Sequence, residues 1–234
     1  ALPISFTVTA NGTQLNASKN GAAATKIATI DAKGIITYNK VDKNAQTLLN
    51  KSAYNVDPFT AGIEIVVTNE CNEILPLTGN KFDVKFLRPI NVVDLKSAEL
   101  KDATTGTAKI DMSKLLGLTD WRGEAFAVEP IDFYTYYGIE GATAISIDKD
   151  KIMTTLNASE AAPKLLKDVA PNMSIDYACD LKKSGNDITY GDLVYANGKF
   201  TINAPFKLFI PVTVKYTFGE VTSTVTLTIT PTHD

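Results

Sequence analysis

Aromatic and charged side chains gather in one stretch of the sequence, between residues 121 and 137. Six of these seventeen residues are aromatic, and one is the only tryptophan of the chain. Aromatic rings stack on flat ligands, and Tyr, Trp and Arg dominate protein-binding hot spots. The stretch therefore predicts a carbohydrate- or receptor-binding surface with the candidate residues Trp121, Arg122, Tyr134, Tyr136 and Tyr137. The alternative interpretation is packing, in which the same rings fill the end of a β-sandwich or an interface between domains.

The residue types present give little support to catalysis. Glu124 with Glu129 or Asp132 offers the two carboxylates that glycoside hydrolysis needs, but any acidic loop contains such a pair. The only histidine, His233, lies one residue from the end of the sequence, where a general base is poorly positioned. We therefore predict that the chain is not an enzyme and has no catalytic residues.

Metal binding is not predicted either. Aspartates recur between residues 148 and 192, but the acidic pattern of a calcium-binding EF-hand is absent, and aspartate is common in turns. The two cysteines, Cys71 and Cys179, are too few for a disulfide scaffold, and we expect them to be buried free thiols. A zinc site would need further ligands. We predict no metal and no cofactor.

Composition and charge limit the classes of partner. The net charge is −3 and no basic cluster exists to neutralise phosphates, so nucleic acid is not expected as a partner. No apolar run approaches the roughly 20 residues that span a bilayer. The chain begins with Ala-Leu-Pro and shows no signal peptide, so we interpret it as a mature or excised form of an exported protein. The expected location is extracellular or at the cell surface.

The last thirty residues define the fold class, because they alternate between apolar and polar residues with a period of two. One face carries Leu208, Ile210, Val212, Val214, Tyr216 and Phe218, and after a turn at Gly219-Glu220 it carries Val221, Val225, Leu227 and Ile229. The opposite face is rich in threonine. Such alternation of β-branched and aromatic residues predicts an antiparallel β-hairpin with one solvated face. Pro211 interrupts the pattern and predicts an edge strand or a bulge.

Short strands separated by Gly, Asn and Pro recur along the rest of the chain, which is typical of β-sandwiches. We predict two domains, residues 1–94 and residues 95–234, with residues 95–107 as a linker or connecting strand. The second domain is expected to contain an insertion at about 111–170. Short helices are expected there from Asp111, as N-cap, to a stop at Gly117, and again over 161–169. A single large sandwich with a long excursion is the alternative.

Three segments resemble a known family. Residues 209–219, residues 118–123 with Tyr136-Tyr137-Gly138 after them, and residues 28–37 are similar to immunoglobulin-like (Ig-like) modules of Bacteroidota cell-surface proteins. Modules of phage fibre or decoration proteins would look alike. The resemblance implies an all-β chain of tandem Ig-like antiparallel β-sandwiches, the second with a short helical insertion. It also implies an exported, modular and non-enzymatic protein, and it transfers no functional residues.

The leading functional prediction is a structural module of an extracellular surface assembly, such as a surface layer, a fibre or an adhesin stalk. Its partners would be other proteins or further copies of itself. The second prediction is a carbohydrate- or receptor-binding module that uses the segment from Trp121 to Tyr137, which adds a glycan as a candidate ligand.

Overall fold

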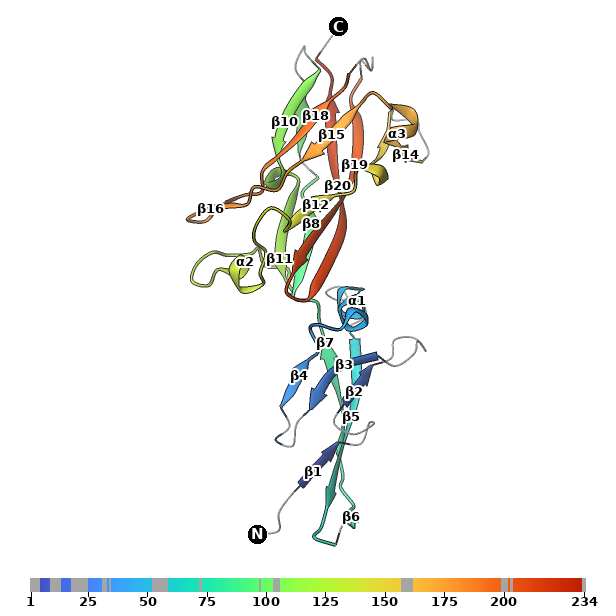
Figure 1. Ribbon diagram of the computed structural model, residues 1–234, viewed down its shortest axis with the longest axis vertical. Coiled ribbons are helices and arrows are strands. Elements are labelled where there is room, and N and C mark those ends of the chain that lie inside the picture. The colour runs from blue at the N-terminus through green and yellow to red at the C-terminus, as the bar shows by residue number, and fades with distance from the viewer. Residues whose placement is uncertain are drawn as a thin grey trace. The chain divides into compact units, whose positions relative to one another are not determined.

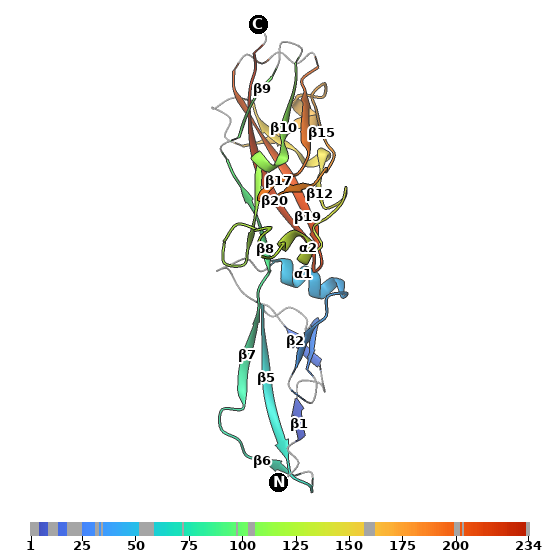
Figure 2. The same ribbon diagram turned by 90° about the vertical axis from the view of Figure 1, so that its left-hand side faces the viewer.

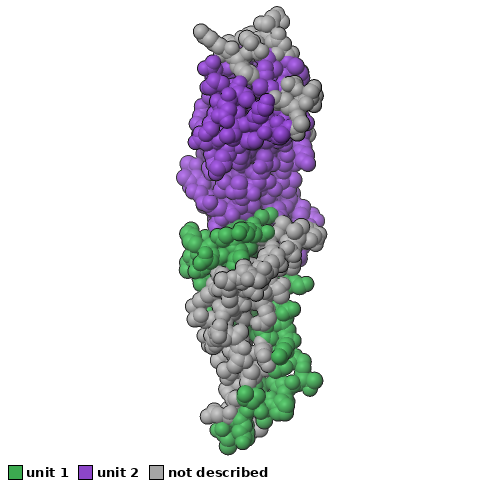
Figure 3. All heavy atoms as spheres, turned by 90° about the vertical axis from the view of Figure 1, so that its right-hand side faces the viewer, with its two compact units in different colours: residues 1–89 green, residues 90–234 purple. Residues whose placement is uncertain are grey.

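The computed structural model divides the chain into two compact units, residues 1–89 (unit 1) and residues 90–234 (unit 2) (Figures 1 and 3). It describes residues 5–8, 14–17, 25–30, 33, 35–51, 59–71, 73–96, 98–102, 106–156, 162–198, 202 and 204–232. Strands dominate both units and the helices are short. The predicted all-β fold class is therefore confirmed.

The described residues of unit 1 form two antiparallel sheets and one helix. Its elements are β1 (Ser5–Val8), β2 (Gln14–Ala17), β3 (Thr25–Ile30), β4 (Ile36–Tyr38), α1 (Lys43–Lys51), β5 (Phe59–Thr68), β6 (Ile74–Leu75) and β7 (Lys81–Phe86). One sheet has the order β1-β5-β6, with β7 also paired to β5, and the other has the order β2-β3-β4. The described core includes Ala28 and Ile30 of β3, Ala45 of α1 and Ile63 of β5.

Helix α1 was not predicted from the sequence, although its signals are present. The Asp42 carboxylate accepts a hydrogen bond of 2.8 Å from the Ala45 backbone N–H, which is the usual role of an N-cap. Ala45, Leu48 and Leu49 then recur at the spacing of one helix face, and Ala45 and Leu49 are buried. The pattern covers only nine residues, so it is easily overlooked among the surrounding strands.

Unit 2 is a β-sandwich with short helical segments. Its strands are β8 (Ile90–Asp94), β9 (Glu99–Lys101), β10 (Thr107–Asp111), β11 (Leu116–Asp120), β12 (Ile145–Ile147), β13 (Met153–Thr155), β14 (Lys164–Leu165), β15 (Ser174–Tyr177), β16 (Lys182–Ser184), β17 (Asp187–Thr189), β18 (Asp192–Ala196), β19 (Phe206–Tyr216) and β20 (Gly219–Thr230). Its helices are η1 (Met112–Lys114), α2 (Phe133–Tyr136), η2 (Lys149–Lys151) and α3 (Leu166–Val169), where η denotes a 3-10 helix.

Two sheets of unit 2 share one apolar core. The larger has the order β14-β13-β19-β20-β9, with β12 also paired to β19, and the smaller has the order β10-β18-β15. Buried residues of both, such as Leu193 of β18 and Leu208 of β19, belong to a single cluster. Two sheets that bury their inner faces against each other form a sandwich. Strand β11 pairs with β8, and β16 pairs with β17 in a separate hairpin.

The terminal hairpin follows the predicted alternation closely. Strands β19 and β20 pair without interruption from Phe206↔Ile229 to Tyr216↔Gly219. The predicted turn at Gly219-Glu220 is wrong, because Thr217 and Phe218 form the turn and Gly219 begins β20. Gly219 has a φ of 112°, a conformation that glycine adopts without steric cost. The chain therefore reverses two residues earlier than the sequence pattern indicates.

Pro211 does not mark an edge strand or a bulge in β19. Strand β19 is central, with β20 on one side and β12 and β13 on the other. Pro211 lies between the part of β19 that pairs with β12 and the part that pairs with β13. Its carbonyl accepts a hydrogen bond of 3.3 Å from the Asp148 backbone N–H. Because the N–H and C=O of one strand residue point to the same side, the missing N–H of proline also faces this gap. The ladder with β20 therefore loses no hydrogen bond.

Three further expectations differ from the structure. The predicted boundary between residues 94 and 95 assigns β8 to the first domain, yet β8 pairs with β11 in unit 2. Gly117 does not end a helix, because it lies within β11. The helix η1 is only three residues long, although Asp111 is its N-cap as expected.

Cys179 is buried, but Cys71 is exposed, and both are free. Residues 99–101 form β9, so the connecting-strand interpretation applies there.

Candidate functional site

The Asp120 side chain organises the turn that presents Trp121. Asp120 ends β11 and is almost fully buried. Its carboxylate accepts hydrogen bonds from the Arg122 N–H (2.7 Å), the Arg122 Nε–H (2.9 Å) and the Glu124 N–H (3.0 Å). Burial acts to raise the pKa of this carboxyl, but the hydrogen bonds from Arg122 and Glu124 outweigh it and hold the pKa below its usual value. The carboxylate therefore shapes the turn and is not poised as an acid.

Trp121 and Arg122 lie at the surface of this turn. Trp121 is 43% exposed, and the Arg122 guanidinium carbon lies 5.7 Å from the centre of the indole ring. This is the distance range of a cation–π interaction. The hydrogen bond from Arg122 to Asp120 also fixes the guanidinium, so ring and cation form a pre-arranged pair.

The other rings of the segment pack around Phe126. The centre of its ring lies 5.7 Å from Phe133, 5.4 Å from Tyr134 and 5.8 Å from Tyr137. Tyr134 is only 3% exposed, and its hydroxyl hydrogen-bonds the hydroxyl of buried Tyr190 at 2.8 Å. Burial raises the pKa of both tyrosines above the usual value. This part of the segment belongs to the core of unit 2.

Tyr137 links this core to the surface. Its carbonyl accepts hydrogen bonds from the N–H (2.8 Å) and the hydroxyl (2.9 Å) of Thr217, so the turn of the terminal hairpin is attached to it. Burial raises the pKa of Tyr137, and the nearby Tyr136 and Asp120 raise it further. Tyr136 itself is 69% exposed and meets the Tyr137 ring edge-on at 5.0 Å. The Asp120 turn and α2 therefore approach the same ring.

Asp132 holds α2 in place. Its carboxylate accepts hydrogen bonds from the backbone N–H groups of Tyr134 (3.0 Å) and Thr135 (3.1 Å), so it is the N-cap of this short helix. It also forms an ion pair of 2.5 Å with Lys183 of β16. Although burial acts to raise the pKa of Asp132, the hydrogen bonds from Lys183 and Thr135 lower it to about 2.

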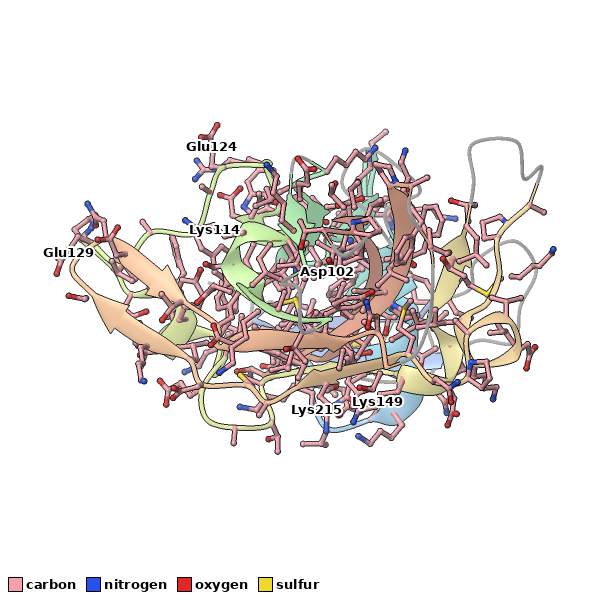
Figure 4. All side chains as sticks on the ribbon, turned by 90° about the horizontal axis from the view of Figure 1, so that it is seen from above. Asp102, Lys114, Glu124, Glu129, Lys149 and Lys215 are labelled. Carbon is pink, nitrogen blue, oxygen red and sulfur yellow. The ribbon has the colours of Figure 1, made fainter. Side chains whose placement is uncertain are left out.

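The carboxylates considered for glycoside hydrolysis do not form a pair. Asp132 is occupied as a cap and ion-pair partner. Figure 4 shows Glu124 and Glu129 at well-separated points on the periphery of the chain, and both are exposed. Their arrangement offers no shared cleft for a scissile bond.

The structure thus divides the five predicted binding residues. Trp121, Arg122 and Tyr136 are exposed, Tyr137 is half-buried, and Tyr134 lies in the core. We name the exposed set of Trp121, Arg122 and Tyr136 the aromatic surface. Its role in binding stays a prediction, whereas the packing interpretation describes Phe126, Phe133 and Tyr134.

The aspartates considered for calcium serve local structure instead. Asp148 is the N-cap of η2 and pairs with Lys151 at 2.8 Å, Asp176 pairs with Lys149, and Asp180 pairs with Lys182 at 2.6 Å. Within the described residues, no three His, Cys, Asp or Glu side chains gather as a metal site would require. A hollow of about 230 Å³ lies beside η2 and α3, and its lysines and aspartates pair with one another.

A second polar region was not singled out from the sequence. Asp102 and Asn197 are both buried, and the Asn197 amide donates a hydrogen bond of 3.0 Å to the Asp102 carboxylate. In the sequence it is one aspartate in a polar stretch, and only the fold places Asn197 and Thr232 beside it.

Helices of the described chain are all too short or too polar to cross a membrane. No protein-family model and no curated protein matches the sequence. Among solved structures, one match is to three N-terminal domains of the Highly Immunogenic Outer Capsid protein (Hoc) of bacteriophage RB49, with 9% sequence identity and a TM-score of 0.31. The match covers 98% of this chain and 58% of that chain. A similarity of this size establishes no family, and the resemblance to Bacteroidota modules stays a prediction.

Proposed function

We propose that this chain is a non-enzymatic structural module of an extracellular surface assembly, such as a surface layer, a fibre or an adhesin stalk. The observation that carries the proposal is the use made of charged side chains in unit 2. Asp120, Asp132 and Asp148 each accept a backbone hydrogen bond that holds a turn or the start of a helix in place. Hydrogen bonds from the side chains of Arg122, Lys183 and Lys151, respectively, lower the pKa values of the three carboxyls. A general acid needs the opposite shift.

The architecture supports the same proposal. The long ladder of β19 and β20 spans the core of unit 2, and two sheets bury their faces in one apolar cluster. We infer that the units are tandem Ig-like sandwiches, which would serve as repeated building blocks of an assembly. Partners would then be other proteins or further copies of the chain.

Electron microscopy of the purified chain tests the structural function directly. Negative-stain images over a concentration series, with and without calcium, should show filaments, sheets or regular arrays. Isolated particles at every concentration would contradict self-assembly and would direct attention to the aromatic surface.

A second candidate function is carbohydrate or receptor binding, which the exposure of Trp121 and Tyr136 favours. Hot spots commonly combine Trp, Tyr and Arg, and all three occur here. The test is a glycan-array screen of the native chain and of Trp121→Ala. Phe82→Ala is a matched control, because Phe82 is an aromatic residue of unit 1 with nearly the same exposure, 42% against 43%. Binding that Trp121→Ala removes and Phe82→Ala retains would support this function.

A further inference from the structure

Strand β9, near the beginning of unit 2, and β20, the last strand of the unit, run side by side in the same direction. Strand β9 pairs in parallel with the end of β20, from Thr228↔Glu99 to Thr230↔Lys101 (Figure 2). This is a parallel pair in a unit whose other strand pairs are antiparallel among the described residues. The Thr228 N–H donates to the Ala98 carbonyl at 3.3 Å, and the Asp102 N–H donates to the Thr230 carbonyl at 3.2 Å.

Acidic side chains extend this pairing beyond the short ladder. The Asp94 carboxylate, at the end of β8, accepts hydrogen bonds from the Thr226 N–H (3.1 Å) and hydroxyl (2.9 Å). The Thr230 hydroxyl donates to Glu99. Each bond joins the beginning of unit 2 to its last strand, and a bond between a hydroxyl and a carboxylate is stronger than one between neutral groups.

Asp102, which directly follows β9, connects the beginning of unit 2 to the residues just after β20. Its carboxylate accepts a hydrogen bond of 2.6 Å from the Thr232 N–H, and its carbonyl accepts one from the Thr232 hydroxyl. Asp102 is only 2% exposed, and its carboxylate also accepts a hydrogen bond from the Asn197 amide. Water therefore competes little with these bonds. Gly106 leaves room for Asn197, because a Cβ there would lie 2.0 Å from the amide oxygen.

The direction of the strands decides how tension would act on these bonds. A pull through residue 90 draws β8 and β9 toward their beginning, and a pull through residue 232 draws β20 toward its end. Because the strands are parallel, these two forces slide them past each other along their length. All bonds between them are then loaded together, whereas strands pulled apart from one end lose their bonds one at a time.

We propose that residues 94–96, 98–102 and 226–232 form a mechanical clamp that resists tension applied across unit 2. The inference rests on the proposed structural function, since tension arises only in a chain that is held at both ends. The clamp consists of the short parallel ladder together with the Asp94–Thr226 and Asp102–Thr232 bonds. It explains why two threonines of the face expected to be solvated, Thr226 and Thr230, are instead bonded to acidic residues.

Single-molecule force spectroscopy of the whole chain, tethered through its two ends, tests the clamp. Unfolding of unit 2 is recognised by the release of up to roughly 500 Å of chain. At constant force, Thr226→Val should unfold roughly tenfold faster than the native chain, because it loses a hydrogen bond to a carboxylate while keeping the β-branched shape. Thr232→Val is a second variant with the same expectation.

Thr213→Val is the matched control. Its hydroxyl lies 3.0 Å from that of Thr222 across β19 and β20, so the substitution also removes one hydroxyl hydrogen bond, but one that does not join β8 or β9 to β20. Its unfolding rate under the same force should change by less than about twofold. Equal acceleration by Thr226→Val and Thr213→Val would overturn the clamp. The assembly seen by electron microscopy is an independent readout, so the proposed function can fail or succeed separately.

Discussion

The terminal hairpin and the aromatic segment from residue 121 to residue 137 lie in the same unit, yet they relate to the sequence in different ways. Along β19 and β20, the apolar residues predicted to face inward are buried, from Leu208 to Ile229, except Phe218, which lies in the turn and is half-buried. In the aromatic segment, Tyr134 is buried, Tyr137 is half-buried and Tyr136 is exposed, although all three are the same residue type.

The difference arises from what determines the direction of a side chain. In a strand, successive side chains alternate by backbone geometry alone, so a period of two is visible in the sequence. In the aromatic segment, direction depends on partners that are distant in the sequence. Tyr134 turns inward because Tyr190 and Phe126 receive it, and Tyr190 lies 56 residues away.

The largest expected effect is that of removing the inward ring of the aromatic segment. Tyr134→Ala should lower the free energy of unfolding of unit 2 by about 3–5 kcal/mol, the usual loss for a buried aromatic ring. Urea unfolding followed by the fluorescence of Trp121, which reports on unit 2 alone, measures it. A loss below about 1 kcal/mol would contradict the buried position of this ring.

A truncation in the hairpin tests whether a buried strand residue contributes as much to the free energy of unfolding as the buried ring of Tyr134. Leu208→Ala should lower the free energy of unfolding by about 2–5 kcal/mol, because Leu208 is fully buried in the centre of the core. The adjacent Lys207→Ala, on the opposite face of β19, should change it by about 0.5 kcal/mol at most. Similar losses for both variants would refute the alternation.

Asp132→Ala tests the attachment of the aromatic segment, with an expected loss of about 1 kcal/mol from the missing N-cap. Because the pKa of Asp132 is lowered to about 2 in the folded state, against roughly 3.9 when unfolded, its contribution is complete above pH 4. The difference from the native chain should then decline as the pH falls from about 4 to 2. Urea unfolding at several pH values measures this, and a difference that stays constant from pH 4 to pH 2 would contradict the role of the ionised Asp132 carboxylate.

The smallest effect is expected for the outward ring. Tyr136→Ala should change the free energy of unfolding by about 0.5 kcal/mol or less, because the side chain is mostly exposed. The same urea experiment compares it with Tyr134→Ala. If Tyr136→Ala and Tyr134→Ala lower the free energy of unfolding equally, the division between core and aromatic surface would be wrong.

Predictions from the sequence succeeded where structure is local and regular. The hairpin and the cap at Asp111 follow from alternation and capping chemistry. They failed where a local signal competed with the fold. Gly117 resembles a helix stop, but pairing of β11 with β8 keeps it in a strand. Pro211 resembles an edge-strand signal, but β19 is central, and the side of Pro211 that lacks an N–H faces the gap between β12 and β13.

The sequence by itself determined the all-β class and the inward face of the hairpin, because the period of a strand is set by its own backbone. Only the tertiary structure decided which rings of the aromatic segment are exposed, and which carboxylates bind which threonines. Asp94 and Thr226 are 132 residues apart in the chain, and no local pattern connects them. Such pairs form because sandwich topology brings the beginning of unit 2 beside its last strand, and buried polar groups must then find partners.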